Sequence, residues 1–200
     1  MNEHTLNEEQ RDALQEICNV GMGKAAAALA RLLGAFVTLS VPDIRLVGVE
    51  QLRFALSAQD DAELRPVRQA FQSDISGEAI VLVGKDGQRE LQERMGHDVG
   101  EPDAEVEVLC DITNLLVGAC VQSVFEQLGR HICFSRPTLL PSAGKKQDAL
   151  VPGGLWDVAL LLEIHFALGD GGFGARMVLL LPDAAIRGMK EALDRFLEAL

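Results

Sequence analysis

The sequence predicts an α+β fold in which long helices pack on a mainly antiparallel sheet. Two observations lead to this fold class. Each half of the 200-residue chain shows one long helical pattern followed by several strand-length apolar segments, and parts of the first half recur in the second half at one constant offset. We therefore expect residues 1–200 to form a single domain made of two repeats, at about 7–98 and 103–200, related by a pseudo-two-fold axis.

The repeat has an offset of 95 residues. The tetrapeptide Glu16-Ile17-Cys18-Asn19 aligns with Asp111-Ile112-Thr113-Asn114. The same offset relates three further pairs of sites: Gly23 and Gly118, Leu33-Gly34 and Leu128-Gly129, and Pro42 and Pro137. One offset maintained through helix, turn and strand is hard to obtain by chance, which favours a duplicated unit.

The first half begins with a helix from about Asn7 to Leu33. Asn7 and Gln10 have the spacing of a capping box, and Gly34 is a typical helix end. Strands are expected at 36–40, 44–49, 53–58, 70–75 and 78–83, and a short helix at 87–95. Residues 99–103 are polar, contain a proline, and are predicted to link the halves.

The second half repeats this order. A helix is predicted at about 104–128, with Gly129 at its end. Strands are expected at 131–136, 156–168 and 174–181, a loop at 141–154, and a last helix at 183–200. Both halves therefore predict one long helix, several strands and a terminal helix.

The outer faces of the long helices carry the candidate site. At about 100° per residue, one face of the first helix is apolar and is expected to pack on the sheet: Leu14, Ile17, Cys18, Gly21, Ala25, Ala28 and Leu32. The opposite face carries Asp12, Glu16, Asn19, Gly23 and Ala30. A carboxylate and a carboxamide three residues apart thus lie side by side and face outward.

The second long helix has the same outward pattern. Its stripe carries Glu107, Asp111, Asn114 and Gly118, and continues with Val121 and Phe125. These two apolar residues are expected to form a contact surface or to be covered by the fold. A single acid–amide pair on a helix is usually just solvated, but two copies require a shared cause, which is either function or common ancestry.

These residues resemble the CheC/CheX/FliY family of aspartyl-phosphate phosphatases. The family pattern is Asp or Ser, three residues, Glu, two residues, Asn, twenty-two residues and Pro, which Asp12, Glu16, Asn19 and Pro42 fit. In the second copy the central Glu is replaced by the shorter Asp, so Glu107, Asp111, Asn114 and Pro137 fit the spacing but not every residue. Two motifs in one chain are similar to CheC.

The resemblance implies a mechanism as well as a fold. Asn19, and Asn114 in the second copy, would hold a water in line with an aspartyl phosphate on the partner, while Glu16 and Asp111 would pair with a lysine there. The flanking residues would make the docking surface: Asp12, Gly23, Pro42, Glu107, Gly118 and Pro137. No cofactor or metal is expected on this chain, since Mg²⁺ would be held by the partner.

The expected partner is a phosphorylated CheY-like response regulator, with the deamidase CheD as a second possible partner. We expect a monomer, with a dimer as the alternative. A rival hypothesis is a non-catalytic interaction protein that binds a receiver, CheD or a flagellar component. A third is a small-molecule sensor, which a deep apolar pocket away from both asparagines would favour.

Composition excludes several other functions. The net charge of −12 argues against binding nucleic acid or an anionic membrane surface. The N-terminal segment is polar and acidic, unlike a signal peptide, and no apolar run reaches membrane-spanning length. A cytoplasmic location is therefore expected. The four cysteines lack CxxC spacing and are predicted to be buried thiols rather than zinc ligands or disulfides.

Two glycine motifs and the histidines are assigned no site. Residues 169–174 contain GxGxxG, but they precede a strand instead of a helix, which indicates a hairpin turn. Gly23-Lys24 lacks the other residues of a phosphate-binding loop. His4, His97, His131 and His165 show no metal-ligand spacing.

Overall fold

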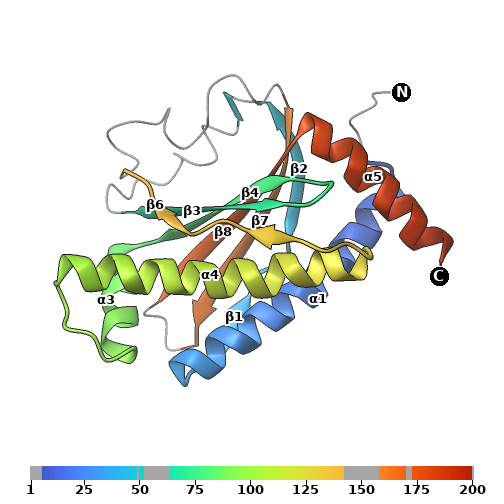
Figure 1. Cartoon of the computed structure of the whole chain (residues 1–200). Coiled ribbons are helices and arrows are strands. Elements are labelled where there is room, and N and C mark those ends of the chain that lie inside the picture. The colour runs from blue at the N-terminus through green and yellow to red at the C-terminus, as the bar shows by residue number, and fades with distance from the viewer. Residues whose placement is uncertain (1–5, 49, 52–63, 142–157, 170–172, 200) are drawn as a thin grey trace.

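A computed structural model of the chain describes residues 6–48, 50–51, 64–141, 158–169 and 173–199. Two long helices, α1 (Glu8–Leu33) and α4 (Pro102–Gln127), lie side by side against one face of a β-sheet (Figure 1). The shorter helices are α3 (Lys85–Arg94) and α5 (Asp183–Glu198). The predicted fold class, helices packed on an antiparallel sheet, is confirmed.

The sheet has eight strands, and every described pairing is antiparallel. Its main path follows the order β1, β7, β8, β4, β3, β5, while β2 pairs with β7 and β6 pairs with β3. The bounds are β1 Val37–Leu39, β2 Asp43–Gly48, β3 Arg65–Gln72, β4 Gly77–Val83, β5 Cys133–Phe134, β6 Thr138–Leu139, β7 Val158–Leu168 and β8 Gly174–Pro182.

Local signals set both ends of α1. The Asn7 side chain accepts a hydrogen bond from the Gln10 backbone N–H, and the Gln10 side chain accepts one from the Asn7 N–H, which is the predicted capping box. Gly34 ends the helix with φ of 62°, in the left-handed region that glycine adopts without steric cost.

Packing in the core brings α1 and α4 close together at Gly21. A Cβ at this position would lie 2.7 Å from the Cys120 carbonyl oxygen and 3.2 Å from a Val124 methyl group. By length and composition alone α4 is apolar enough to cross a membrane, but 61% of its most apolar stretch is buried inside the fold. Burial between α1 and the sheet accounts for this hydropathy.

Strand register repeats along with the sequence. Leu39 pairs with Phe166 in one half, and Phe134 pairs with Phe71 in the other, so both members shift by 95 residues. Beyond the β3–β4 and β7–β8 hairpins, the offset between equivalent residues becomes 98, since α3 begins at Lys85 and α5 at Asp183. The hairpin between β7 and β8 is thus three residues longer. This arrangement supports the duplication, which stays a proposal.

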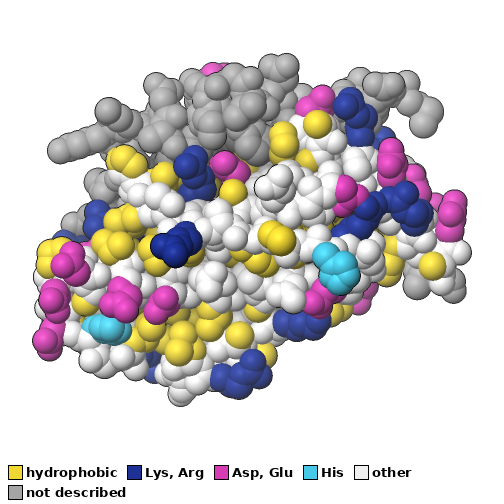
Figure 2. Space-filling view, viewed as in Figure 1, with side chains coloured by type: hydrophobic (Ala, Val, Ile, Leu, Met, Phe, Trp, Pro, Cys, Tyr) yellow, Lys and Arg dark blue, Asp and Glu magenta, His cyan; other side chains and the backbone are white. Residues whose placement is uncertain are grey.

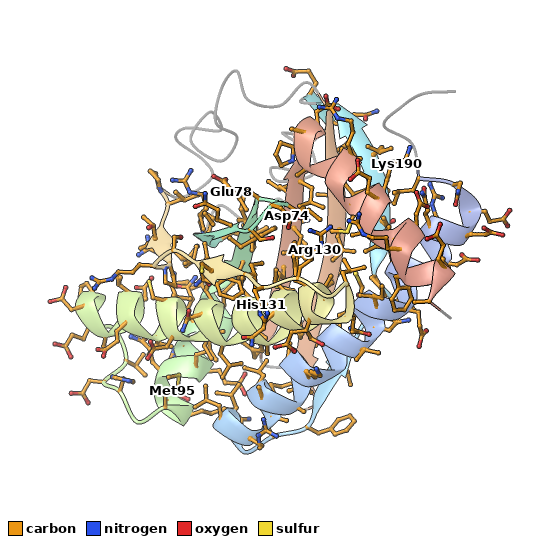
Figure 3. All side chains as sticks on the ribbon, turned by 45° about the vertical axis from the view of Figure 1, so that its right-hand side comes forward. Asp74, Glu78, Met95, Arg130, His131 and Lys190 are labelled. Carbon is orange, nitrogen blue, oxygen red and sulfur yellow. The ribbon has the colours of Figure 1, made fainter. Side chains whose placement is uncertain are left out.

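An ion pair between Arg130 and Asp74 joins the residues that follow α4 to the turn between β3 and β4; both side chains are labelled in Figure 3. Arg130 follows the turn at Gly129, whose φ is 69°. The backbone N–H of Arg130 also donates to the carbonyl of Phe125. These contacts fix where the chain leaves α4 towards β5.

Several predicted boundaries were wrong. The strand predicted at 70–75 is β3 and covers 65–72, and the short strand β6 was not predicted. The linker lies at 95–101 instead of 99–103, because α3 ends at Arg94 and α4 begins at Pro102. Leu32 is exposed although its helical phase placed it on the core face, while Ala28 and Ala30 are half-buried. The strand expected at 53–58 and most of the 141–154 loop lie outside the described residues.

The cysteines divide into two groups. Cys18 and Cys120 are buried, as predicted, but Cys110 is half-buried and Cys133 is exposed. Burial raises the pKa of the Cys120 thiol to about 12. It also raises the pKa of Cys18 well above its usual value, and the neighbouring Cys120 adds to that shift. Both thiols of the core are therefore protonated at neutral pH.

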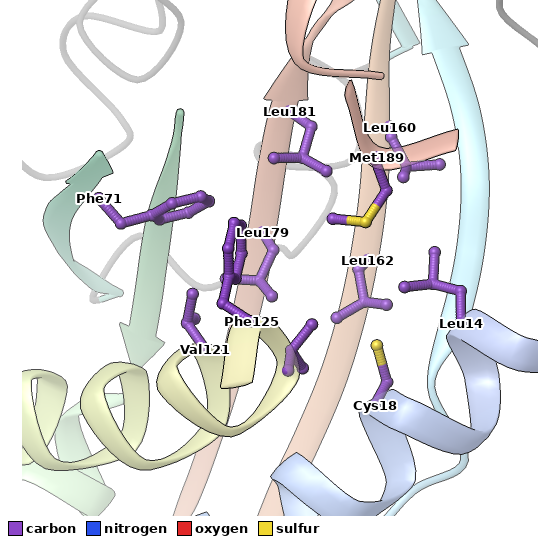
Figure 4. A pocket seen from close by; sticks show the side chains of 11 residues that line it. Leu14, Cys18, Phe71, Val121, Phe125, Leu160, Leu162, Leu179, Leu181 and Met189 are labelled. Carbon is purple, nitrogen blue, oxygen red and sulfur yellow. The ribbon is translucent and has the colours of Figure 1, made fainter. Parts of the chain in front are cut away.

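An apolar cavity lies between the sheet and helices α1, α4 and α5 (Figure 4). Its volume is about 30 Å³, which is room for a few water molecules at most. Its lining includes Leu14, Cys18, Phe125 and Met189. A gap of this size in the core does not hold a metabolite, so the cavity offers no support for a small-molecule sensor.

Candidate functional site

The first candidate site is an outward stripe on α1. Asp12, Glu16, Asn19 and Gly23 are all exposed, as the helical phase predicts. Leu14, Ile17 and Cys18 on the inner face are at most 2% exposed. Because these apolar side chains anchor α1 to the sheet, the rotation of the helix is fixed and the polar stripe faces solvent.

The polar groups of this stripe have no partner in the described part of the chain. Neither the Glu16 carboxylate nor the Asn19 carboxamide makes a hydrogen bond or ion pair there. Both side chains are therefore available to another molecule. The nearby exposed Lys24 is paired across the helices with Glu126, at 4.0 Å.

Gly23 and Gly118 lack a packing reason within the described fold. A Cβ built on either glycine meets no atom within 4 Å. A glycine inside a helix costs about 1 kcal/mol relative to alanine, so their presence opposes stability. Gly21 differs from both, because the nearby α4 backbone leaves no space for a Cβ there, whereas Gly23 and Gly118 leave the helix backbone open.

The second candidate site lies on α4. Glu107, Asp111 and Asn114 are exposed, and Gly118 is half-buried. Unlike Asn19, Asn114 has a partner, because its Oδ1 accepts a hydrogen bond of 2.9 Å from Nε2 of Gln69. The two candidate asparagines thus differ in the structure although their sequence motifs are similar.

Gln69 lies on β3, beneath α4, and is 1% exposed. Its Nε2 also donates to the backbone carbonyl of Ser135, at 3.0 Å. Sequence reasoning missed Gln69 because the predicted strand began one residue after it. A polar residue in phase with the buried Val67 and Phe71 was the signal that would have found it.

The two motif prolines are less accessible than the helical residues. Pro42 is buried and lies in the connection between β1 and β2, while Pro137 is half-buried between β5 and β6. The Pro137 carbonyl lies 4.0 Å from the Cys110 sulfur. Both prolines therefore lie in connections between strands, and neither belongs to the exposed helix faces.

The apolar continuation of the α4 stripe is covered by the fold. Val121 is fully buried, and Phe125 packs edge-to-face on Phe71 with ring centroids 5.5 Å apart. Of the two interpretations that the sequence left open, the covered one is correct. The exposed part of the second stripe therefore ends near Gly118.

Acidic side chains surround the start of α4. Figure 2 shows them gathered at the end of the molecule where α4 and α3 lie. They include the exposed Glu101, Asp103, Glu107 and Asp111. A concentration of carboxylates attracts cationic groups and repels nucleic acid.

A model of the CheC-like family matches residues 9–45, which contain the whole first motif. The CheY-P phosphatase CheC of Bacillus subtilis (strain 168) is 27% identical over 124 residues. That match covers 57% of this chain and 57% of CheC, so the chain spans less than two thirds of its curated relative.

Solved structures share the fold. Thermotoga maritima FliY has a TM-score of 0.73 and 17% identity, with 96% of this chain and 99% of that chain covered. A FliM middle domain from H. pylori has a TM-score of 0.67, 10% identity and coverage of 94% and 99%. CheX in a CheX–CheY–BeF3–Mg²⁺ complex from Borrelia burgdorferi has a TM-score of 0.53, 10% identity and coverage of 82% and 96%. Together these matches confirm the resemblance inferred from the motif.

Proposed function

We propose, from the premise that this chain is related to the CheC/CheX/FliY family, that it hydrolyses the aspartyl phosphate of a CheY-like response regulator. The observation that carries the proposal is the outward stripe of α1, where Glu16 and Asn19 are exposed and unpartnered beside Gly23. The matched CheC is a CheY-P phosphatase, and the matched CheX is in complex with CheY.

The proposed reaction requires little chemistry from this chain. A water oxygen attacks phosphorus, the bond between phosphorus and the aspartyl oxygen breaks, and the products are inorganic phosphate, a free carboxylate and a proton. Such a reaction depends mainly on positioning and charge neutralisation. Asn19 positions the water. Its amide oxygen accepts a hydrogen bond from the water, so that a lone pair of the water oxygen points towards phosphorus.

Glu16 holds the two proteins in register. Its carboxylate, one helical turn from Asn19, forms a charge-assisted hydrogen bond with a lysine of the partner. Gly23 lets the partner backbone approach α1, since no Cβ stands in the way. Mg²⁺ and the phosphorylated aspartate are both supplied by the receiver.

The second site repeats this arrangement on α4 with Asp111 and Asn114. Asp111 is one methylene shorter than Glu16, so its carboxylate reaches less far from the helix. Glu107 and Gly118 take the places of Asp12 and Gly23 in the docking surface. We propose that both sites act, and that the first is the more active.

The test is steady-state dephosphorylation of a CheY-like receiver by the wild type, Asn19→Ala and Asn114→Ala, with Gln122→Ala as an exposed control on α4 outside the motif. Asn19→Ala is expected to remove most of kcat, by roughly tenfold or more if one positioned group contributes in the usual range. Equal activity in all four proteins would exclude both asparagines from the reaction.

A second candidate function is binding without hydrolysis. A FliM middle domain shares this fold, and a fold alone does not establish chemistry. In this case the chain would bind a receiver, CheD or a flagellar component through the same stripes. Stable binding to the phosphorylated receiver with an unchanged phosphoryl lifetime would favour this candidate over the phosphatase.

A further inference from the structure

We propose that Gln69 is a positioning residue that orients Asn114 for the attack of water at the second site. This inference rests on the proposed function, because it assigns a partner to one of the two proposed water-orienting amides. The observation behind it is the hydrogen bond of 2.9 Å between Gln69 Nε2 and Asn114 Oδ1.

The neighbouring backbone determines how both amides are turned. The Ser135 carbonyl accepts only, so the group of Gln69 that faces it must be the NH₂ group, at 3.0 Å. The second hydrogen of that NH₂ then requires an acceptor on Asn114, which must present its Oδ1 inward. One lone pair of Oδ1 and both hydrogens of the Asn114 amide are left for a water or a phosphoryl oxygen.

Gln69 destabilises the core. Its side chain is 1% exposed, and its Oε1 is buried without a hydrogen-bond partner in the described part of the chain. A buried, unsatisfied amide oxygen destabilises a fold. Stability therefore does not explain a glutamine at this position. Its hydrogen bond to the exposed Asn114 side chain does.

The other repeat provides an internal control. Ser135 exchanges two hydrogen bonds with Ala70, through its backbone N–H and its hydroxyl. Ser40 makes the same two bonds with His165, 95 residues later than Ala70. The two strand edges are thus built alike, so the residue that corresponds to Gln69 is Ile164.

Ile164 is fully buried and apolar, and it offers no hydrogen bond to Asn19. The first site thus combines the longer carboxylate of Glu16 with an unrestrained amide. The second combines the shorter Asp111 with an amide that Gln69 holds in place. An amide that is already ordered loses less rotational freedom when the receiver docks, which offsets weaker docking by Asp111.

The test isolates each site and then exchanges the buried residue. Gln69→Ile copies the first site, and it is introduced into Asn19→Ala, which retains only the second site, and into Asn114→Ala, which retains only the first. In Asn19→Ala we expect kcat for receiver dephosphorylation to fall about three- to tenfold with KM unchanged, as for the loss of one ordered side chain. In Asn114→Ala we expect no change in kcat.

A second readout does not depend on activity. In the free wild-type protein, ¹⁵N relaxation should report a more rigid side-chain amide for Asn114 than for Asn19. In Gln69→Ile the Asn114 amide should become as mobile as that of Asn19. The unfolding midpoint of Gln69→Ile should be unchanged or raised, since the variant removes an unsatisfied buried amide.

The outcomes separate the two proposals. An inactive wild type overturns the phosphatase function and this inference with it. An active wild type overturns the inference alone in any of three cases: Asn19→Ala has no residual activity, Gln69→Ile leaves its kcat unchanged, or Gln69→Ile lowers kcat equally in both backgrounds. An Asn114 amide as mobile as that of Asn19 in the wild type also overturns it.

Discussion

At the scale of single residues, the two proposed water-orienting asparagines differ in their contacts with the fold. Asn19 is exposed and makes no contact that the described fold requires. Asn114 is exposed too, but it is connected to the core through Gln69. Substituting the two asparagines should therefore affect stability differently, even where it affects the same reaction.

Asn19→Ala is expected to leave the free energy of unfolding unchanged or to raise it by about 0.5 kcal/mol, because alanine has the higher helix propensity. Asn114→Ala gains the same propensity but leaves one Gln69 hydrogen without its acceptor, which costs about 1 kcal/mol. Urea denaturation of both variants measures the difference. A large loss of stability in Asn19→Ala would show that Asn19 has a structural role.

The four thiols should react in the order of their exposure. Near pH 8, iodoacetamide should label Cys133 first and Cys110 slowly, while the buried Cys18 and Cys120 stay unlabelled in the native protein. Peptide mass spectrometry gives the order. Rapid native labelling of Cys120 would contradict the packing of α1 against α4.

The same burial predicts a loss of stability in alkaline solution. The pKa of Cys120 is raised from 9.0 to about 12 in the fold. Unfolding then releases a thiol that ionises above about pH 9, so its stabilising contribution is complete below that pH and is lost as pH rises towards 12. Unfolding midpoints measured from pH 8 to 11 should fall more steeply for the wild type than for Cys120→Ala.

The sequence was informative for residues whose role depends on helical phase. The exposed face of α1 carries the residues that the helical phase predicted there, namely Asp12, Glu16, Asn19 and Gly23. The buried face of α1 determines the rotation of the helix and so the direction of these side chains. The role of Gln69 was not predictable in this way. Its contact with Asn114 joins β3 to α4, and residue spacing does not report which side chains meet between separate elements.

At the scale of elements, α1 was predicted well because its signals are local. A capping box and a glycine determine its ends within a few residues. The β3 strand was placed too late, since Pro66 in its second position reads as a strand breaker although strand ends accept proline. The two-residue strand β6 is too short to produce a periodic pattern.

Two glycines of α1 give a matched pair for testing the packing. Gly21→Ala should destabilise the protein by about 1–3 kcal/mol, because the new methyl group would collide with the Cys120 carbonyl and Val124. Gly23→Ala should stabilise it by about 0.5–1 kcal/mol, because the methyl group meets no atom and alanine favours the helix. Thermal unfolding compares the two.

Gly23→Ala has a second expected effect. If a receiver approaches the α1 backbone at this position, the added methyl group should raise KM for the phosphorylated receiver although the protein is more stable. A variant that is more stable and binds the receiver as well as the wild type would show that Gly23 is not part of the docking surface.

At the scale of the whole molecule, the chain presents two similar surfaces, one on α1 and one on α4. The repeated strand register and the symmetric sheet order support duplication as the origin of this arrangement. Because no described contact joins Asn19 to Asn114, the sites are expected to act independently. The kcat values of Asn19→Ala and Asn114→Ala should then add up to the kcat of the wild type. A sum that differs from the wild-type kcat would show that a receiver bound at one site affects the other.

Other whole-molecule features stay predictions from the sequence. They are a monomeric state, a cytoplasmic location, binding of CheD, and the absence of a cofactor on this chain. Composition and a family motif indicate these properties, but none of them is determined by the fold. Sedimentation velocity of the purified chain, alone and with CheD, measures the monomeric state and the binding of CheD.

The phosphatase proposal requires this chain to turn over phosphorylated receiver with its two outward asparagines. The most direct measurement is release of inorganic phosphate from a phosphorylated CheY-like receiver in large molar excess over this protein, for the wild type and for Asn19→Ala/Asn114→Ala. We expect many turnovers per wild-type molecule, and decay at the receiver's own rate with the double variant. Phosphate release by the double variant at the wild-type rate would contradict it.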